Sequence, residues 1–131
     1  MDESFEERNE LEVDPAGRVR HGIGLFNARE YFECHEVLEL EWVEEKGPRR
    51  LFLQALIHFA VGLYHAGRGN YAGADGQIRK GLRKMEPYLP RHSGIDTASL
   101  QQAMSAVREA IRRGERFEAP AIVLTDQADG C

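Results

Sequence analysis

The sequence is poor in cysteine, in tryptophan and in long apolar runs. Of its 131 residues, two are cysteine and one is tryptophan, and aromatic residues make up 8%. Cys34 and Cys131 do not have the spacing of a disulfide framework, which is typical of a reducing compartment. No apolar run reaches the ~18 residues of a membrane span, and the acidic N-terminus lacks a signal-peptide pattern. We therefore expect a cytoplasmic protein with no membrane partner.

Basic residues are scarce in the first third of the chain. Residues 1–45 contain 14 acidic and 4 basic residues, a net charge of −10, whereas residues 46–131 have a net charge of +5. Single-strand nucleic-acid binders interleave their basic residues with aromatic residues, and the later basic group lacks this pattern. We expect a solvated helix surface and no nucleic-acid partner. The basic group contains Arg79, Lys80, Arg83, Lys84, Arg108, Arg112, Arg113 and Arg116.

Alternating segments long enough for a sheet are also lacking, and helical periodicity dominates. We predict an all-α fold, a compact single-domain bundle of about five helices with an extended C-terminal tail. The predicted parts are a mobile acidic arm (1–16), the helical domain (17–114) and the extended tail (115–131).

Capping and helix-breaking residues predict where the helices begin and end. After a short first helix, Asn27 and Glu30 resemble a capping box that starts the second helix, and Gly47-Pro48 ends it. The third helix runs from Arg49 to about Ala66 and is apolar nearly all round, as expected of a central helix. Asn70 and Asp96 are predicted caps of the fourth and fifth helices, and Gly114 follows the end of the fifth.

Ionisable residues interrupt the apolar pattern of residues 31–42, which lie within the predicted second helix. At ~100° per residue, His35 lies at the centre of the apolar face, and Glu36 and Glu39 point inward or to its boundary. The same projection directs Cys34 away from the core and Glu41 into water. Burying His35 and the two inward glutamates is costly unless they have partners.

The third helix carries a matching polar stripe of Gln54, His58 and His65. The short Gly-Pro link makes the two helices antiparallel neighbours, so we expect the inward glutamates opposite Gln54 and His58. His65 should lie level with Tyr31 and Phe32, and at ~1.5 Å per residue it is about 16 Å from Gln54.

Several functions fit this group of residues. The first is a buried polar network, structural or ligand-binding, of His35, Glu36, Glu39, Gln54, His58 and His65. The second is a divalent-metal site of His35, Glu39 and His58 with Glu36 as the catalytic general base, in a hydrolase-like enzyme whose motif resembles HExxH. A metal-free acid–base or small-ligand pocket is a third. A fourth is an interaction module, including a homodimer, that uses the charge asymmetry or the tail.

Several motifs also resemble the domain of unknown function 309 family. They are FNAREYFECHEVLE (26–39) followed by Trp42, LQALIH (53–58), YH (64–65), GNYAGA (69–74) and GID (94–96) with Leu100. The resemblance runs from about residue 18 to 113 and implies a compact all-α fold without an established activity. It also implies glutamine at the position of His58 in many members, which favours a hydrogen-bonding role there. The arm and the tail lie outside it.

Overall fold

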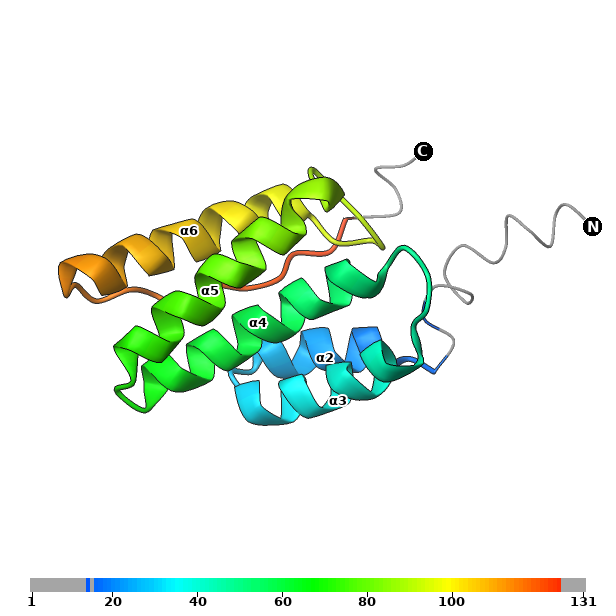
Figure 1. Cartoon of the computed structure of the whole chain (residues 1–131), viewed down its shortest axis with the longest axis horizontal. Helices are drawn as coiled ribbons and strands as arrows, with labels where there is room; N and C mark the ends of the chain where they lie inside the picture. The colour runs from blue at the N-terminus through cyan, green and yellow to red at the C-terminus, as the bar shows by residue number, and fades with distance from the viewer. Residues whose placement is uncertain (1–13, 15, 126–131) are drawn as a thin grey trace, which may run out of the picture.

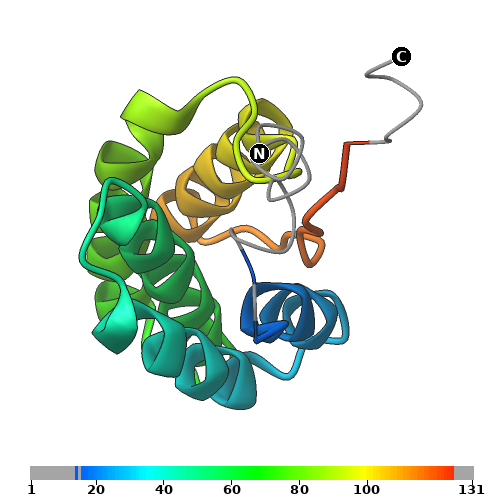
Figure 2. The same ribbon diagram turned by 90° about the vertical axis from the view of Figure 1, so that its right-hand side faces the viewer.

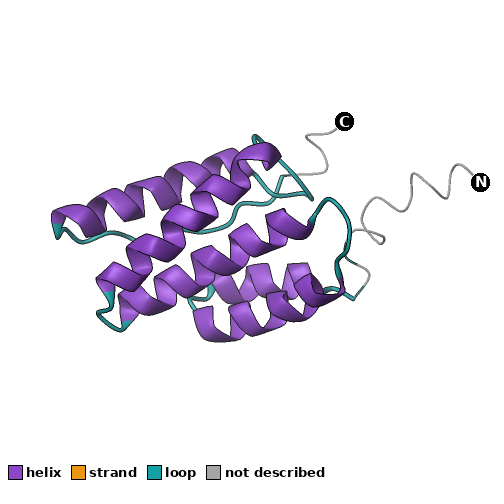
Figure 3. Ribbon diagram, in the orientation of Figure 1, coloured by secondary structure: helices purple, strands orange, loops and turns teal. Residues whose placement is uncertain are grey.

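The computed structural model describes Asp14 and residues 16–125, and in this part of the chain it contains five α-helices and no β-strand (Figure 3). The helices are α2 (Arg18–Asn27), α3 (Tyr31–Glu44), α4 (Arg50–Gly67), α5 (Tyr71–Met85) and α6 (Thr97–Arg113), with a short 3-10 helix η1 (Glu86–Tyr88) after α5. The all-α prediction is confirmed. No helix in the described part is both long and apolar enough to cross a membrane.

The helices form two layers. In one layer α3, α4 and α5 lie side by side, with α4 in the middle (Figure 1). The other layer consists of α2, which packs on α3, and α6, which packs on α5 (Figure 2). The core lies between the layers and includes Phe52, Phe59 and Leu56 of α4 with Met104 of α6, all fully buried. The opposite side of the α3–α4–α5 layer faces solvent.

Close backbone contact joins α4 to α5. A Cβ atom added at Gly81 would lie 2.6 Å from Phe59 Cε1 and 3.1 Å from the carbonyl oxygen of Ala55. A Cβ atom at Gly62 would lie 2.7 Å from Ile78 Cγ1. Real Cβ atoms do not approach so closely, so the two glycines permit this helix spacing.

Two of the three predicted N-terminal helix caps are present, and the third is not. Asn70 Oδ1 accepts from the Gly73 amide at 3.0 Å, and Asp96 Oδ1 accepts from the Ser99 amide at 2.9 Å, as predicted. The capping box at Asn27 is wrong, because Asn27 ends α2 and α3 begins only at Tyr31. The Asn27 side chain instead donates to the Ile122 carbonyl and accepts from its amide.

The two predicted flanking segments contain residues that pack on the domain. The arm's residues 1–13 and 15 and the tail's residues 126–131 lie outside the described residues. Asp14 is buried, and its carboxylate accepts from the amides of Val19 and Arg20 at the start of α2. Residues 115–125 are non-helical and run between α2 and α6, where Ile122 is buried in the core (Figure 2). Asp14 and Ile122 therefore belong to the folded unit.

Candidate functional site

Helix α3 turns a different side to the core from the one predicted. Its buried residues are Cys34, Leu38 and Glu41, whereas His35 is only half-buried. At about 100° per residue, the centre of the buried side of α3 lies between Cys34 and Leu38, roughly 80° around the helix from His35. The prediction that Cys34 and Glu41 point away from the core is wrong.

The physical reason is that α3 has apolar residues on two sides. Phe32, Leu40 and Val43 are 47%, 58% and 57% exposed, although all three are strongly apolar. They shifted the predicted centre of the apolar face toward His35. A residue's hydrophobicity shows that burial is favourable, but the packing partners decide which residues are buried.

The predicted residues of α3 lie at the surface of the domain. Glu36 is exposed, and Glu39 has 52% of its side chain exposed, with its Oε2 atom 3.6 Å from His35 Nε2. The other ring nitrogen, His35 Nδ1, is 3.0 Å from the Phe32 carbonyl oxygen. Glu36 and Glu39 are therefore exposed rather than buried as predicted, whereas His35 is half-buried at the edge of α3.

Gln54 and His58 of α4 contact α5 instead of α3. Lys84 Nζ donates to Gln54 Oε1 and to His58 Nε2, both at 2.9 Å. With Nε2 accepting, His58 Nδ1 carries the proton and donates to Gln77 Oε1 at 2.8 Å. Burial and the nearby cation Lys84 lower the pKa of His58, which favours this neutral tautomer.

Lys84 has an unusual environment for a cation. Burial, together with the charges of Lys80 and Arg83, lowers its pKa. Its acceptors are the neutral groups of Gln54 and His58, which stabilise an ammonium ion less than a carboxylate would. The α4–α5 side of the layer therefore has a net positive charge near its surface.

The predicted network is therefore divided between two places: His35 and Glu39 pair along α3, and Gln54 and His58 pair with α5. His65 is half-buried near the end of α4, next to Tyr64. Among the described residues, no three His, Cys, Asp or Glu side chains are grouped closely enough to hold a metal ion. The metal-ligand and general-base roles stay predictions from the sequence.

A buried ion cluster between α2, α3 and α4 was missed by the sequence analysis. Glu41 is 6% exposed, and its carboxylate lies 3.2 Å from Arg18 Nη1 and 3.6 Å from Arg49 Nη1. Arg49 is also 3.3 Å from Glu45, across the Gly-Pro link. The signal was the arginine directly after this link, since residues that flank a short helix–helix turn lie close together.

Cys34 is buried at the centre of the inward side of α3. Burial raises the pKa of its thiol to about 12. The thiol therefore stays protonated near neutral pH and behaves as a small apolar core residue rather than a nucleophile.

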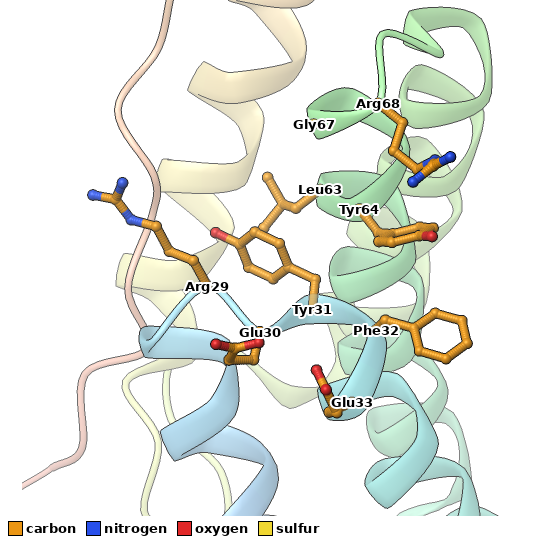
Figure 4. Close-up of a pocket in the computed structure, with 9 residues that line it drawn as sticks. All are labelled: Arg29, Glu30, Tyr31, Phe32, Glu33, Leu63, Tyr64, Gly67 and Arg68. Carbon is orange, nitrogen blue, oxygen red and sulfur yellow. The ribbon is translucent and has the colours of Figure 1, made fainter.

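A shallow pocket of about 440 Å³ lies where the start of α3 meets the end of α4. Figure 4 shows Tyr31 directed toward Leu63 and Phe32 directed outward. Phe32 lies against the Tyr64 ring at 5.4 Å between centroids, and the Arg68 guanidinium lies 5.6 Å from that ring. This contact agrees with the predicted register, which placed the end of α4 level with Tyr31 and Phe32.

We call the solvent side of the α3–α4–α5 layer the outer face. Acidic and apolar residues from α3 lie along one edge, half-buried residues of α4 lie in the middle, and basic residues from α5 lie along the other edge. Its residues are Phe32, Glu36, Glu39, Leu40, Val43, Gln54, His58, Val61, Tyr64, Gln77, Lys80, Arg83 and Lys84.

The fold and this face define a two-layered helical domain with an exposed, partly apolar surface. Residues 19–76 match the model of the family described as a domain of unknown function (DUF309), which confirms the resemblance from the motifs over that range. The chain is also similar to the uncharacterized protein YpuF of Bacillus subtilis (strain 168). The two are 29% identical over 116 residues, which are 86% of this chain and 67% of YpuF.

Proposed function

We propose that this domain is a protein-interaction module and that it binds its partner through the outer face. The observation that carries the proposal is the exposure of Phe32, Leu40 and Val43 on a helix that already buries its other side. Burying apolar surface is favourable by about 25 cal/mol per Å², so a partner that covers these residues gains binding energy. Leu40 and Val43, three residues apart, are neighbours on the helix surface, and contiguous exposed apolar residues often mark binding surfaces.

The aromatic group at one end of the face supports the proposal. Phe32 contacts both His35 and Tyr64, with ring centroids 5.3 Å and 5.4 Å away. Arg68 lies near Tyr64 on its other side. Aromatic residues and arginine are enriched in protein interfaces, and aromatic side chains bury much area with little loss of side-chain freedom.

The polar groups on the face support binding rather than catalysis. His58 is hydrogen-bonded at both ring nitrogens, and one of these bonds is to a lysine ammonium. Glu36, the predicted general base, is on the exposed outer side of α3. A general base acts from within a pocket that surrounds the substrate, and the exposed outer side of α3 does not provide such a pocket around Glu36.

Site-specific photo-crosslinking in intact cells tests the proposal. A photo-reactive amino acid replaces Val43 on the outer face, and a control chain carries it at Ser105, an exposed position on α6. We expect discrete crosslinked adducts from position 43 and none of the same mass from position 105. Equal labelling at both positions, or none at position 43, would contradict a binding role for the face.

A further inference from the structure

The outer face has opposite charges along its two edges. Helix α3 contains five glutamates and no lysine or arginine, and Glu36 and Glu39 are on its outer side. Helix α5 contains four basic residues and a single acid, Asp75. Because Asp75 is paired with Arg108 of α6 at 2.8 Å, it leaves the outer side of α5 uniformly basic. Such a face is complementary to itself.

The charged groups also lie at the same height along α4. Near one end of the face, Phe32 of α3 lies level with Tyr64, which sets the register between α3 and α4. The contact of Gly81 with Ala55 and Phe59 sets the register between α4 and α5. With both registers applied, Glu39 lies level with Lys80 and Arg83, on the opposite side of α4.

Symmetry then decides which edges can meet in a face-to-face pair. A two-fold axis parallel to α4 places α3 of one copy over α5 of the other, so acidic residues oppose basic residues at equal heights. A two-fold axis across α4 places α3 over α3 and α5 over α5, which brings like charges together. Only the first arrangement joins opposite charges twice in one dimer.

We propose that the partner of the outer face is a second copy of this chain, in a dimer with its two-fold axis parallel to α4. This inference rests on the proposed function. The glutamates of each α3, Glu36 and Glu39, pair with Lys80 and Arg83 of the other copy's α5, and the exposed apolar residues of α3 are covered between them. The negative first third of the chain and its positive remainder thus attract each other between molecules.

The size of the face suits a small, reversible interface. Helix α4 has 18 residues, which at about 1.5 Å per residue gives about 27 Å of length. Three helices packed about 10 Å apart give about 20 Å between the outer axes. The resulting area, about 540 Å² per partner, is in the range of weak, transient interfaces.

Sedimentation equilibrium with two charge-reversed variants tests the pairing. Glu36→Lys/Glu39→Lys makes both edges of the face basic, and Lys80→Glu/Arg83→Glu makes both acidic. All four residues are exposed, so both variants should fold like the wild type, which circular dichroism checks. We expect a dimer for the wild type and at least tenfold weaker self-association for each variant alone.

Mixing the two variants is the decisive step. In the mixed dimer each edge again meets its opposite charge, so we expect the dimer mass to return. A matched control, Glu109→Lys/Glu115→Lys, changes the net charge equally at exposed positions outside the face and should leave the wild-type dimer unchanged. A monomeric wild type, dimerisation that is insensitive to the variants, or a mixture that stays monomeric would overturn the inference.

The crosslinking experiment separates this inference from the proposed function. Adducts that join position 43 to α5 of a second copy support both. Adducts to a different protein leave the binding role intact and overturn the self-pairing. Crosslinks to the chain's own residues 1–13, or no crosslinks, overturn both.

Discussion

The two apolar sides of α3 contain similar residues but have different neighbours. On the inward side, Leu38 is 1% exposed and packs against α2, where a Cβ atom at Gly22 would lie 2.8 Å from its Cδ2 atom. On the outward side, Leu40 is only two residues away and is more than half exposed. The comparison shows that α3 buries one apolar side in the core and leaves apolar residues exposed on the other, which is the side of the proposed binding surface.

The glutamates of α3 show the same difference. Glu41 is buried between Arg18 and Arg49, and it connects α2, α3 and α4. Glu36, five residues earlier, is exposed. The acidic residues that matter for folding are therefore distinct from those that we assign to binding.

The largest expected effect is a loss of stability on truncating Leu38, compared with the same truncation of Leu40. Leu38→Ala should lower the free energy of unfolding by about 4 kcal/mol, because it leaves a cavity between α2 and α3. Leu40→Ala should change it by less than about 0.5 kcal/mol. Urea unfolding followed by circular dichroism measures both. Similar losses in the two variants would contradict the division of α3 into a core side and a binding side.

The second effect concerns the two glutamates. Glu41→Gln should cost about 3 kcal/mol of stability, because Arg18 and Arg49 lose their shared carboxylate in a mostly buried place. Glu36→Gln is the matched change at the surface and should cost less than about 0.5 kcal/mol. Thermal unfolding at neutral pH compares them. A Glu41→Gln chain as stable as Glu36→Gln would show that the cluster does not hold the layers together.

The smallest effect is a pH dependence at the α4–α5 contact. Because burial lowers the pKa of His58 in the folded chain, the unfolded chain binds more protons as the pH falls below 6.5. Stability due to neutral His58 is therefore complete above pH 6.5 and is lost as the pH falls toward the lowered value. His92, whose pKa is also lowered by burial, contributes in the same direction.

The His58→Gln variant should have a flatter stability profile below about pH 6.5 than the wild type. His92→Gln, measured in parallel, should remove a separate part of the slope, so the double variant should be flattest. Urea unfolding at closely spaced pH values provides the data. An unchanged slope in His58→Gln would contradict the neutral, lysine-bonded state of this histidine.

Local signals predicted most of the fold. The caps at Asn70 and Asp96 and the left-handed Gly114 after α6 were identified because each satisfies backbone groups within one turn. The capping prediction at Asn27 was wrong for the opposite reason, because its side chain hydrogen-bonds to the backbone of Ile122, 95 residues away. A local pattern cannot show such competition from a distant segment.

The candidate site was harder to predict because it depends on which side of each helix is covered. Apolar residues on both sides of α3 gave an averaged direction that matched neither side. Lys84 could have been found: it lies about as many residues after the 67–70 turn as Gln54 lies before it, so the two are level in an antiparallel pair. The 67–70 turn relates α4 to α5 in the same way as the Gly-Pro link relates α3 to α4.

The most direct test of the binding surface is the self-association of Leu40→Gln/Val43→Gln, measured by sedimentation equilibrium. This double variant removes exposed apolar groups without changing the charge, and Ser105→Gln/Ala106→Gln on α6 is its matched control. The account predicts at least tenfold weaker dimerisation, with the free energy of unfolding within about 0.5 kcal/mol of the wild type. A double variant that dimerises as tightly as the wild type would contradict it.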